Sequence, residues 1–208
     1  MSGARVSPSA GVAWPVRLSS GPVLLRPLSL RDRDAWREVR TRNAAWLVRW
    51  DATVPPGADS RPTSYRSLVR TLHRQARLGT TYPFAIEVED RFVGQVTVNN
   101  VVRGSAQFAS IGYWLDQAVA GRGIMPRAVA MVIDHCFGPL GLHRIEIAIR
   151  PENSNSLRVV EKLGLHEYGL APRYLHIDGD WRDHRLYAIT REECRGSLLE
   201  RLEGPEGS

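Results

Sequence analysis

The chain has 208 residues, 43% of them hydrophobic and 24% charged, a composition that excludes collagen-like, mucin-like and wholly disordered proteins. Its 28 basic and 22 acidic residues give a net charge of +6, so phosphorylated cofactors and RNA are candidate partners. The longest apolar run, residues 128–133, is far shorter than the roughly 20 residues that span a bilayer, and the chain begins without a signal-peptide pattern. We therefore expect a cytoplasmic protein with no membrane partner.

The two ends of the chain differ in composition from its middle. Residues 1–13 and 196–208 are rich in small, polar, Gly and Pro residues, which predicts weakly ordered tails around a single domain at 14–195. The two cysteines, Cys136 and Cys194, lie far apart and lack the spacing of a zinc site or a disulfide framework. We expect both to be free thiols.

The first part of the domain predicts one strand and two helices. Residues 23–28 form a short apolar strand, and Ser29 followed three residues later by Asp32 is typical of a helix start. We expect this helix to continue to about Trp46. Apolar residues then recur at intervals of three and four between residues 62 and 78, which predicts a second helix with one buried face.

The rest of the domain predicts a strand meander, a long helix and a hairpin. Residues 84–89, 92–102 and 108–115 alternate in polarity and are rich in β-branched and aromatic side chains, as antiparallel strands are. Residues 125–137 place apolar side chains at helical spacing. The last expected elements are a strand at 143–150, a helix at 155–163 and a hairpin of 174–177 with 181–189. This order predicts an α/β domain with about seven strands and four helices.

A glycine-containing loop joins the strand at 108–115 to the long helix. Such a loop points free backbone N–H groups and the positive end of the helix dipole at one spot, which suits a phosphate. A dinucleotide-binding motif would need a third glycine where Pro126 stands, and the Gly-Lys-Ser/Thr of a nucleoside-triphosphate loop is absent. The alternative is that Gly121 and Gly123 only permit a tight turn.

Four segments carry a resemblance to a known family. They are Ile-Gly-Tyr-Trp-Leu at 111–115, the glycine loop at 118–123, the run Pro-Glu-Asn-Ser-Asn-Ser-Leu-Arg-Val-Val-Glu-Lys-Leu-Gly-Leu at 151–165 and the hairpin at 179–183. With these segments the chain resembles the GCN5-related N-acetyltransferase (GNAT) superfamily, and within it the bacterial ribosomal-protein alanine acetyltransferases of the RimJ/RimL type. The resemblance extends over about residues 23–193.

The resemblance implies the GNAT fold, a single mixed and mostly antiparallel twisted sheet that is splayed near Leu115 by acetyl-CoA, the co-substrate. The pantetheine amides would pair with the backbone of the preceding strand, and the pyrophosphate would bind the amides of residues 120–125. The resemblance also places Asn153 beside the pantetheine arm, but Asn153 and Asn155 could instead be helix caps. The side chains of Tyr113 and Trp114 could be core residues. The implied cofactor-binding residues are Tyr113, Trp114, Leu115, Ala120, Gly121, Arg122, Gly123, Ile124, Met125, Asn153 and Asn155.

The chain departs from the family pattern at the catalytic positions. Val160 stands where many GNAT enzymes keep a tyrosine that reprotonates the departing thiolate. In the RimJ/RimL type a serine at the place of Ser156 is the proposed proton donor, and the alternative for Ser156 is a helix-start hydroxyl that bonds the backbone. Ser110 replaces a frequent glutamate, Glu146 could be a structural ion-pair partner, and no residue is assigned as the general base.

The missing base favours one kind of acceptor. A chain-terminal amine has a pKa near 7.8, whereas a lysine amine has a pKa near 10.4, so the terminal amine needs less help to lose its proton. We therefore expect direct acetyl transfer to a protein N-terminus, and the resemblance implies a ribosomal protein. The alternatives are a small-molecule or antibiotic amine acetyltransferase, and a CoA-binding ribosome-associated protein without catalysis.

Basic and histidine residues complete the candidate list. Arg66, Arg70, Arg74 and Arg77, with His73, form a stripe opposite the buried face of the second helix. This stripe is either a solvated helix face or a contact to ribosomal RNA. The histidines show no metal-ligand spacing, so we expect no metal and assign packing roles to all six: His73, His135, His143, His166, His176 and His184.

Overall fold

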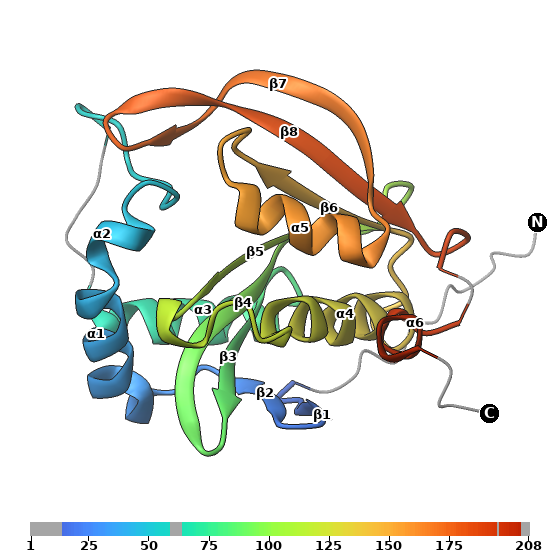
Figure 1. Cartoon of the computed structure of the whole chain (residues 1–208), viewed down its shortest axis with the longest axis horizontal. Helices are drawn as coiled ribbons and strands as arrows, with labels where there is room; N and C mark the ends of the chain where they lie inside the picture. Colours follow the sequence, from blue (N-terminus) through green and yellow to red (C-terminus); the bar gives the residue numbers. More distant parts are fainter. Residues whose placement is uncertain (1–13, 59–63, 195, 205–208) are drawn as a thin grey trace, which may run out of the picture.

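A computed structural model describes residues 14–58, 64–194 and 196–204. Its core is one eight-stranded sheet with the order β1-β2-β3-β4-β5-β6-β8-β7, in which every neighbouring pair is antiparallel except β5 with β6 (Figure 1). The strands are β1 (Leu18–Ser20), β2 (Val23–Pro27), β3 (Tyr82–Val88), β4 (Arg91–Val102), β5 (Phe108–Leu115), β6 (Arg144–Ile149), β7 (His166–Ile177) and β8 (Asp180–Thr190). The predicted mixed, mostly antiparallel sheet is confirmed. The expected number of about seven strands is corrected to eight, because the three-residue β1 is too short to show a pattern.

Helices cover both faces of this sheet. The six α-helices of the described residues are α1 (Arg33–Arg42), α2 (Ala44–Leu47), α3 (Tyr65–Arg77), α4 (Ile124–Phe137), α5 (Ser154–Leu163) and α6 (Leu198–Glu203). The nearly all-apolar α4 packs with α5 in the larger hydrophobic cluster on one face. On the other face, Val39 of α1 and Val69 of α3 pack with Ala85 and Phe92 in a second cluster. The sheet is therefore covered on both sides, as its alternating apolar residues require.

The expected single helix after Ser29 is divided in the structure. Ser29 and Asp32 do form a capping box, but they begin a 3-10 turn, Leu30–Asp32, before α1 starts. Asn43 then separates α1 from α2 with backbone angles of φ −99° and ψ 11°. Its side chain hydrogen-bonds across to the loop after β5, and this tertiary contact breaks the helix.

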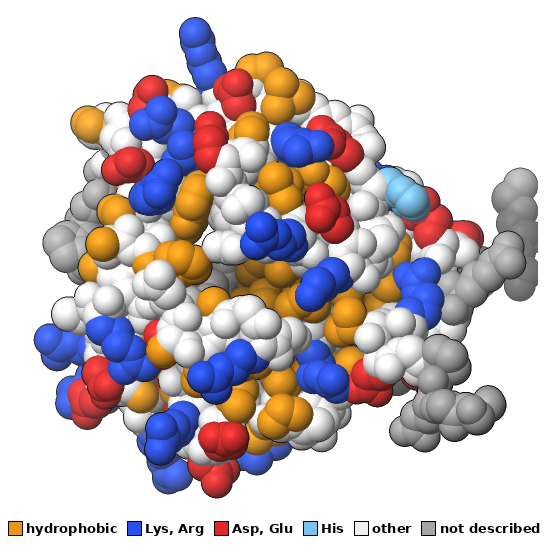
Figure 2. Space-filling model, viewed as in Figure 1, with side chains coloured by type: hydrophobic (Ala, Val, Ile, Leu, Met, Phe, Trp, Pro, Cys, Tyr) orange, Lys and Arg blue, Asp and Glu red, His pale blue; other side chains and the backbone are white. Residues whose placement is uncertain are grey.

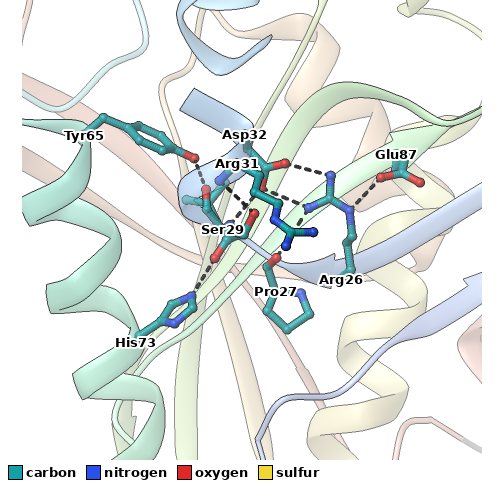
Figure 3. Close-up of polar contacts among 9 residues, drawn as sticks. Arg26, Pro27, Ser29, Arg31, Asp32, Tyr65, His73 and Glu87 are labelled. Carbon is teal, nitrogen blue, oxygen red and sulfur yellow. Dashed lines mark hydrogen bonds and ion pairs between the residues drawn. The ribbon is translucent and has the colours of Figure 1, made fainter. Parts of the chain in front are cut away.

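A polar cluster fixes the first helical turn against the sheet (Figure 3). Arg26 donates to both carboxylate oxygens of Asp32 at 2.9 and 2.8 Å and to Glu87 at 2.6 Å. The Tyr65 hydroxyl donates to the Ser29 carbonyl at 2.8 Å, which ties α3 to the same turn. The members of this cluster come from β2, β3, the 3-10 turn before α1, and α3. The cluster therefore fixes the position of α1 and α3 against the sheet.

Three expectations on the remaining chain are corrected. His73 does not belong to the solvated stripe, because its Nε2 donates to the Leu28 carbonyl at 2.6 Å. The expected strand at 174–177 begins eight residues earlier, at His166. In the expected tail at 196–208, Leu198–Glu203 forms α6, and Leu198 is buried with 1% of its surface exposed. The tail residues 1–13 and 205–208 lie outside the described part of the chain.

Candidate active site

The sheet opens where its two parallel strands diverge. β5 and β6 pair only at Phe108, Ala109 and Ser110, whereas β5 stays paired with β4 as far as Leu115. β6 likewise stays paired with β8 as far as Ile149. A cavity of about 800 Å³ occupies the opening and is lined by residues of both separated segments. Figure 2 shows a hollow with hydrophobic side chains near the middle of the face on which Figure 1 draws α4 and α5.

Gly94 brings β4 unusually close to the end of β5. A Cβ atom on Gly94 would lie 2.4 Å from the Trp114 carbonyl oxygen and 3.1 Å from the Leu115 Cα. These distances exclude any side chain at position 94 unless the backbone of β5 moves. Gly94 therefore determines the position of the β5 backbone that borders the cavity.

Nearly all of the expected cofactor-binding residues border this cavity. Gly121 and Gly123 have φ angles of +81° and +75°, which favour glycine, and both lie in open space. Arg122 does not line the cavity, and its side chain reaches back to the Ala118 carbonyl at 3.5 Å. The expected site residues that line it are Tyr113, Trp114, Leu115, Ala120, Gly121, Gly123, Ile124, Met125, Asn153, Asn155 and Ser156.

A buried carboxylate holds the loop between β5 and α4. Asp116 accepts hydrogen bonds from Asn43 Nδ2 at 2.8 Å and the Ala118 N–H at 3.2 Å, and it pairs with Arg42. Asn43 Oδ1 in turn accepts from the Gln117 N–H at 2.9 Å. Burial favours the protonated carboxyl, but Arg42, Asn43 and the backbone outweigh it and lower the pKa of Asp116. The loop is thus anchored by a charged group that sequence analysis did not single out.

At the start of α5 the helix cap is Asn153 and not Ser156. Asn153 Oδ1 caps the helix by accepting the Ser156 N–H at 3.2 Å, and Asn153 also lines the cavity. The Tyr113 hydroxyl lies 3.5 Å from the Ser156 carbonyl oxygen, and burial raises the pKa of this phenol. Val160 is fully buried on the same helix. The Ser156 hydroxyl has no hydrogen bond to the backbone among the described residues, so the cap belongs to Asn153 alone.

The opposite side of the cavity has a polar row on the sheet. Gln95, Thr97 and Asn99 pair in register with Trp114, Gly112 and Ser110, and antiparallel partners share a face. Trp114 packs in the cluster with α1 and α3, so the row faces those helices rather than α4 and α5. This row was not predicted from the sequence, although the polar alternation of the strand at 92–102 was the signal for it. Aromatic and apolar residues complete this side: Trp46, Leu47, Trp50, Leu68, Leu72, Tyr174, Leu175 and Ile177.

The β7–β8 hairpin closes this side of the cavity. In Figure 1 the hairpin arches over α5 and β6 toward the segment after α2. There Ala52 bridges Ile177, and the Thr53 N–H donates to the His176 carbonyl at 2.8 Å. Arg150, at the end of β6, donates to the Arg49 carbonyl of the same segment at 2.7 Å. The hairpin and the α2 segment thus form a continuous wall.

The carboxylates near the site are already paired. Glu146 forms the expected structural ion pair, with Arg144 Nε 2.6 Å from its Oε1. Asp51 is the one acidic residue among the described residues that line the cavity, and it forms a two-pronged ion pair with Arg40. The Arg40 guanidinium lies over the rings of Trp36 and Trp114, 5.6 and 5.2 Å from their centroids.

No group of three or more His, Cys, Asp or Glu residues is arranged to hold a metal within the part of the chain that the structure describes. Across that part, no helix combines the length and apolarity needed to cross a bilayer. Cys136 and Cys194 are buried free thiols, as expected.

Comparison with known proteins identifies the family. The acetyltransferase (GNAT) domain family matches residues 23–166. The structure of Mycobacterium smegmatis RimJ in complex with CoA-disulfide is 42% identical, with a TM-score of 0.85 over 91% of this chain and 94% of that one. The Bacillus subtilis protein named "Probable N-acetyltransferase YjcK" is 36% identical over 83% of this chain and 96% of its own. The ribosomal protein uS5-alanine N-acetyltransferase of Escherichia coli is 31% identical over 84% and 91%.

Proposed function

The chain belongs to the GNAT acetyltransferase family and is an acetyl-CoA-dependent N-acetyltransferase, and we propose that it acetylates the α-amino group of a ribosomal protein. The observation that carries this proposal is the cavity between β5 and β6, which has a glycine loop on one side and a polar, aromatic wall on the other. A thioester and an amine could approach each other there from opposite faces of the sheet. The relatives named for ribosomal-protein acetylation support the choice of acceptor.

In this proposal acetyl-CoA lies along the end of β5. The unpaired edge of residues 111–115 is available to the pantetheine amides, because β6 has diverged there. The pyrophosphate would bind the backbone N–H groups between Ala120 and Met125 at the start of α4, where the helix dipole favours negative charge. Asn153 and Asn155 would border the pantetheine arm. Arg122 would contribute its backbone amide only.

The proposed reaction is a direct transfer. The neutral amine attacks the thioester carbonyl, the tetrahedral intermediate collapses, and CoA leaves as a thiolate. We assign Ser156 as the donor that returns a proton to this thiolate, since Ser156 borders the cavity and its hydroxyl is not used as a cap. Most of the rate enhancement would come from holding the two reactants together and from backbone N–H groups that polarise the carbonyl.

The acceptor wall favours a terminal amine over a lysine. A lysine amine needs a strong base to lose its proton near neutral pH, and Asp51, the one carboxylate at the described cavity wall, is engaged by Arg40. Uncharged Gln95, Thr97 and Asn99 can hydrogen-bond the first peptide groups of a bound chain. The wall thus suits an extended protein N-terminus.

The test is acetyl-CoA turnover with three acceptors. These are a peptide with a free N-terminal alanine, the same peptide with a blocked N-terminus and one internal lysine, and a small primary amine. We expect CoA release and a mass gain of one acetyl group with the first peptide only. Turnover with the small amine alone would instead indicate a small-molecule acetyltransferase, and CoA binding without any turnover would indicate a protein that has lost catalysis.

The stripe on α3 supports a further part of the proposal, contact with ribosomal RNA. Arg66, Arg70, Arg74 and Arg77 are all exposed. A depression of about 210 Å³ lies beside this stripe and is lined by Arg66, Arg70, Arg74, Ser64, Ser67 and Thr71. Guanidinium and hydroxyl donors together suit phosphate oxygens.

A further inference from the structure

His184 borders the cavity, although sequence analysis treated it as a packing residue. It lies on β8 with only 3% of its surface exposed. Its register partner is Ala171 of the hairpin, and it lines the cavity with Tyr174, whose ring meets the imidazole edge to face with centroids 5.5 Å apart.

Strand register places His184 on the acceptor side of the sheet. Asn99 pairs with Ser110, Ser110 with Glu146, and Glu146 with Ala188, so these four side chains share one face. Side chains in a strand alternate, and His184 precedes Ala188 by four residues, so it shares that face. This is the face of the polar row and of Trp114, and it is opposite to α4 and α5.

A backbone contact sets the protonation of the imidazole. His184 Nδ1 lies 3.0 Å from the Arg182 carbonyl oxygen, which can only accept, so Nδ1 carries the hydrogen. In the neutral ring Nε2 then has a free lone pair. Trp36 Nε1 is the single fully enclosed side-chain N or O atom without a partner in the described residues. His184 Nε2 has no hydrogen-bond partner among these residues either, yet it is not one of the enclosed atoms, so it is accessible on a residue that lines the cavity.

From this arrangement we propose that His184 Nε2 is the general base, which accepts a proton from the amine of the acceptor. The acceptor enters as an ammonium ion and gives one proton to Nε2. The resulting neutral amine forms the C–N bond to the thioester carbonyl and loses its second proton to solvent. The C–S bond then breaks to release CoA thiolate, which takes a proton from Ser156, and a proton from solvent restores the Ser156 hydroxyl. The imidazolium then returns its proton to solvent, so that each turnover forms one amide, one CoA thiol and one free proton.

The surroundings of the imidazole suit this role at neutral pH. Burial lowers the pKa of His184, and the nearby Arg150 charge lowers it further, whereas the Arg182 carbonyl, Glu152 and Asp183 act in the opposite direction. The net effect is a lowered pKa, so the ring is neutral at pH 7 with its Nε2 lone pair available, and the imidazolium formed in the reaction readily returns its proton to solvent. Tyr174 is the titratable side chain that faces it from β7. The inference depends on the proposed function in one respect, because it requires an amine as the acceptor.

The test compares His184→Asn with the wild-type protein. The asparagine amide can still donate to the Arg182 carbonyl, but it has no group at the position of Nε2. We expect kcat/KM for the N-terminal alanine peptide at pH 7 to fall about 100-fold or more, with acetyl-CoA affinity retained. The deficit should narrow above pH 9, where the α-amine is neutral without a base. His135→Asn is the matched control, because His135 is also a buried histidine with a pKa lowered by burial, but it does not line the cavity.

Two further results distinguish a wrong general base from a wrong acceptor. If the wild type acetylates the peptide and His184→Asn does so equally, with an unchanged pH profile, the general base is wrong and the proposed function stands. If the wild type acetylates only the small amine, the proposed acceptor is wrong, and the same comparison tests His184 on that amine. Should the variant not fold, ¹⁵N NMR of the wild-type protein decides. A neutral ring at pH 7 with the proton on Nδ1 is expected, and a proton on Nε2 would overturn the inference.

Discussion

Asn43 and Asp116, which are 73 residues apart in sequence, share a buried hydrogen bond of 2.8 Å that joins the end of α1 to the loop before α4. The lowered pKa of Asp116 means that this carboxylate is more stable ionised in the folded than in the unfolded chain. Its contribution to the free energy of unfolding is therefore present above the unfolded pKa, near 3.9, and is lost as the pH falls through the lower folded pKa.

The first prediction follows from this pH dependence of stability. Asp116→Asn should lower the free energy of unfolding by about 2 kcal/mol at pH 7, because Arg42 loses its buried partner. The difference between variant and wild type should shrink below pH 4, as the wild-type carboxyl also becomes neutral. Denaturant unfolding at pH 7 and pH 3 measures both values. Asp34→Asn is the control, since Asp34 pairs only with its exposed neighbour Arg33 and should change little. A difference that stays constant with pH would contradict the assignment.

The second prediction concerns the close approach at Gly94. Gly94→Ala would place a Cβ 2.4 Å from the Trp114 carbonyl and push the end of β5 toward the cavity. We expect at least a tenfold loss of acetyl-CoA affinity together with about 2 kcal/mol of lost stability, as for other overpacked sites. Isothermal titration and denaturant unfolding measure the two effects. Gly169→Ala is the control, because an added Cβ at this strand position meets no atom within 4 Å. Undiminished affinity in Gly94→Ala would show that the β5 backbone does not hold the cofactor.

Local patterns in the sequence predicted most of the fold. The strand at 108–115 has the bounds that were expected, and the helices at 125–137 and 155–163 differ by one residue at their starts. The hairpin was only partly predicted because β7 has register shifts at two places and Arg173 has a positive φ, which disturb its alternation. The break at Asn43 depends on a residue 73 positions away, and no local pattern contains that information.

The candidate site likewise has one part that local sequence patterns reveal and one part that depends on contacts between distant residues. The residues expected to bind the cofactor could be singled out from the sequence because they lie in two contiguous segments, one from the end of β5 to the start of α4 and one at the start of α5. The opposite wall of the cavity was not predicted, because Trp50, Asn99 and His184 lie far apart in the sequence and meet only through strand pairing and the hairpin. The tautomer of His184 is likewise set by a backbone contact that its sequence neighbours do not reveal.

A third prediction tests the glycine loop. Gly123→Val places a β-branched residue at a φ of +75°, at the N-cap of α4, and should displace the amides that would bind the pyrophosphate. We expect acetyl-CoA to lose its stabilising effect on the melting temperature, which a bound ligand otherwise raises by mass action. Gly104→Val introduces the same residue at a φ of +71° in a loop that does not line the cavity. If both variants bind acetyl-CoA as the wild type does, the pyrophosphate site lies elsewhere.

A fourth prediction tests the proton donor. Ser156→Ala retains the backbone N–H that Asn153 accepts, so the melting temperature should stay within about 1 °C of the wild type. If Ser156 protonates the thiolate, kcat should fall at least tenfold while acetyl-CoA affinity remains unchanged. Steady-state kinetics with the N-terminal alanine peptide measure the loss. Asn153→Ala is the contrasting variant, since removing the cap should lower stability by about 1 kcal/mol. Ordinary turnover by Ser156→Ala would remove its catalytic role.

The last prediction concerns the basic stripe on α3. If Arg66, Arg70, Arg74 and Arg77 contact ribosomal RNA, co-sedimentation with ribosomes should weaken steeply with added salt, because each neutralised phosphate releases condensed counterions. The double change Arg70→Glu with Arg74→Glu should then release the protein from ribosomes. Acetylation of a short free peptide should stay close to normal, because neither residue lines the cavity between β5 and β6.

A matched pair of charge reversals distinguishes a docking surface from general charge. Arg91→Glu with Arg201→Glu changes the net charge by the same amount at exposed positions on β4 and α6. Ribosome binding that survives this control but not the α3 variant would locate the contact on the stripe, since nonspecific attraction depends on net charge and would weaken equally in both. Equal binding by the α3 variant and the wild type would instead mean that the stripe is a solvated helix face, and that the acceptor is recognised at the cavity alone.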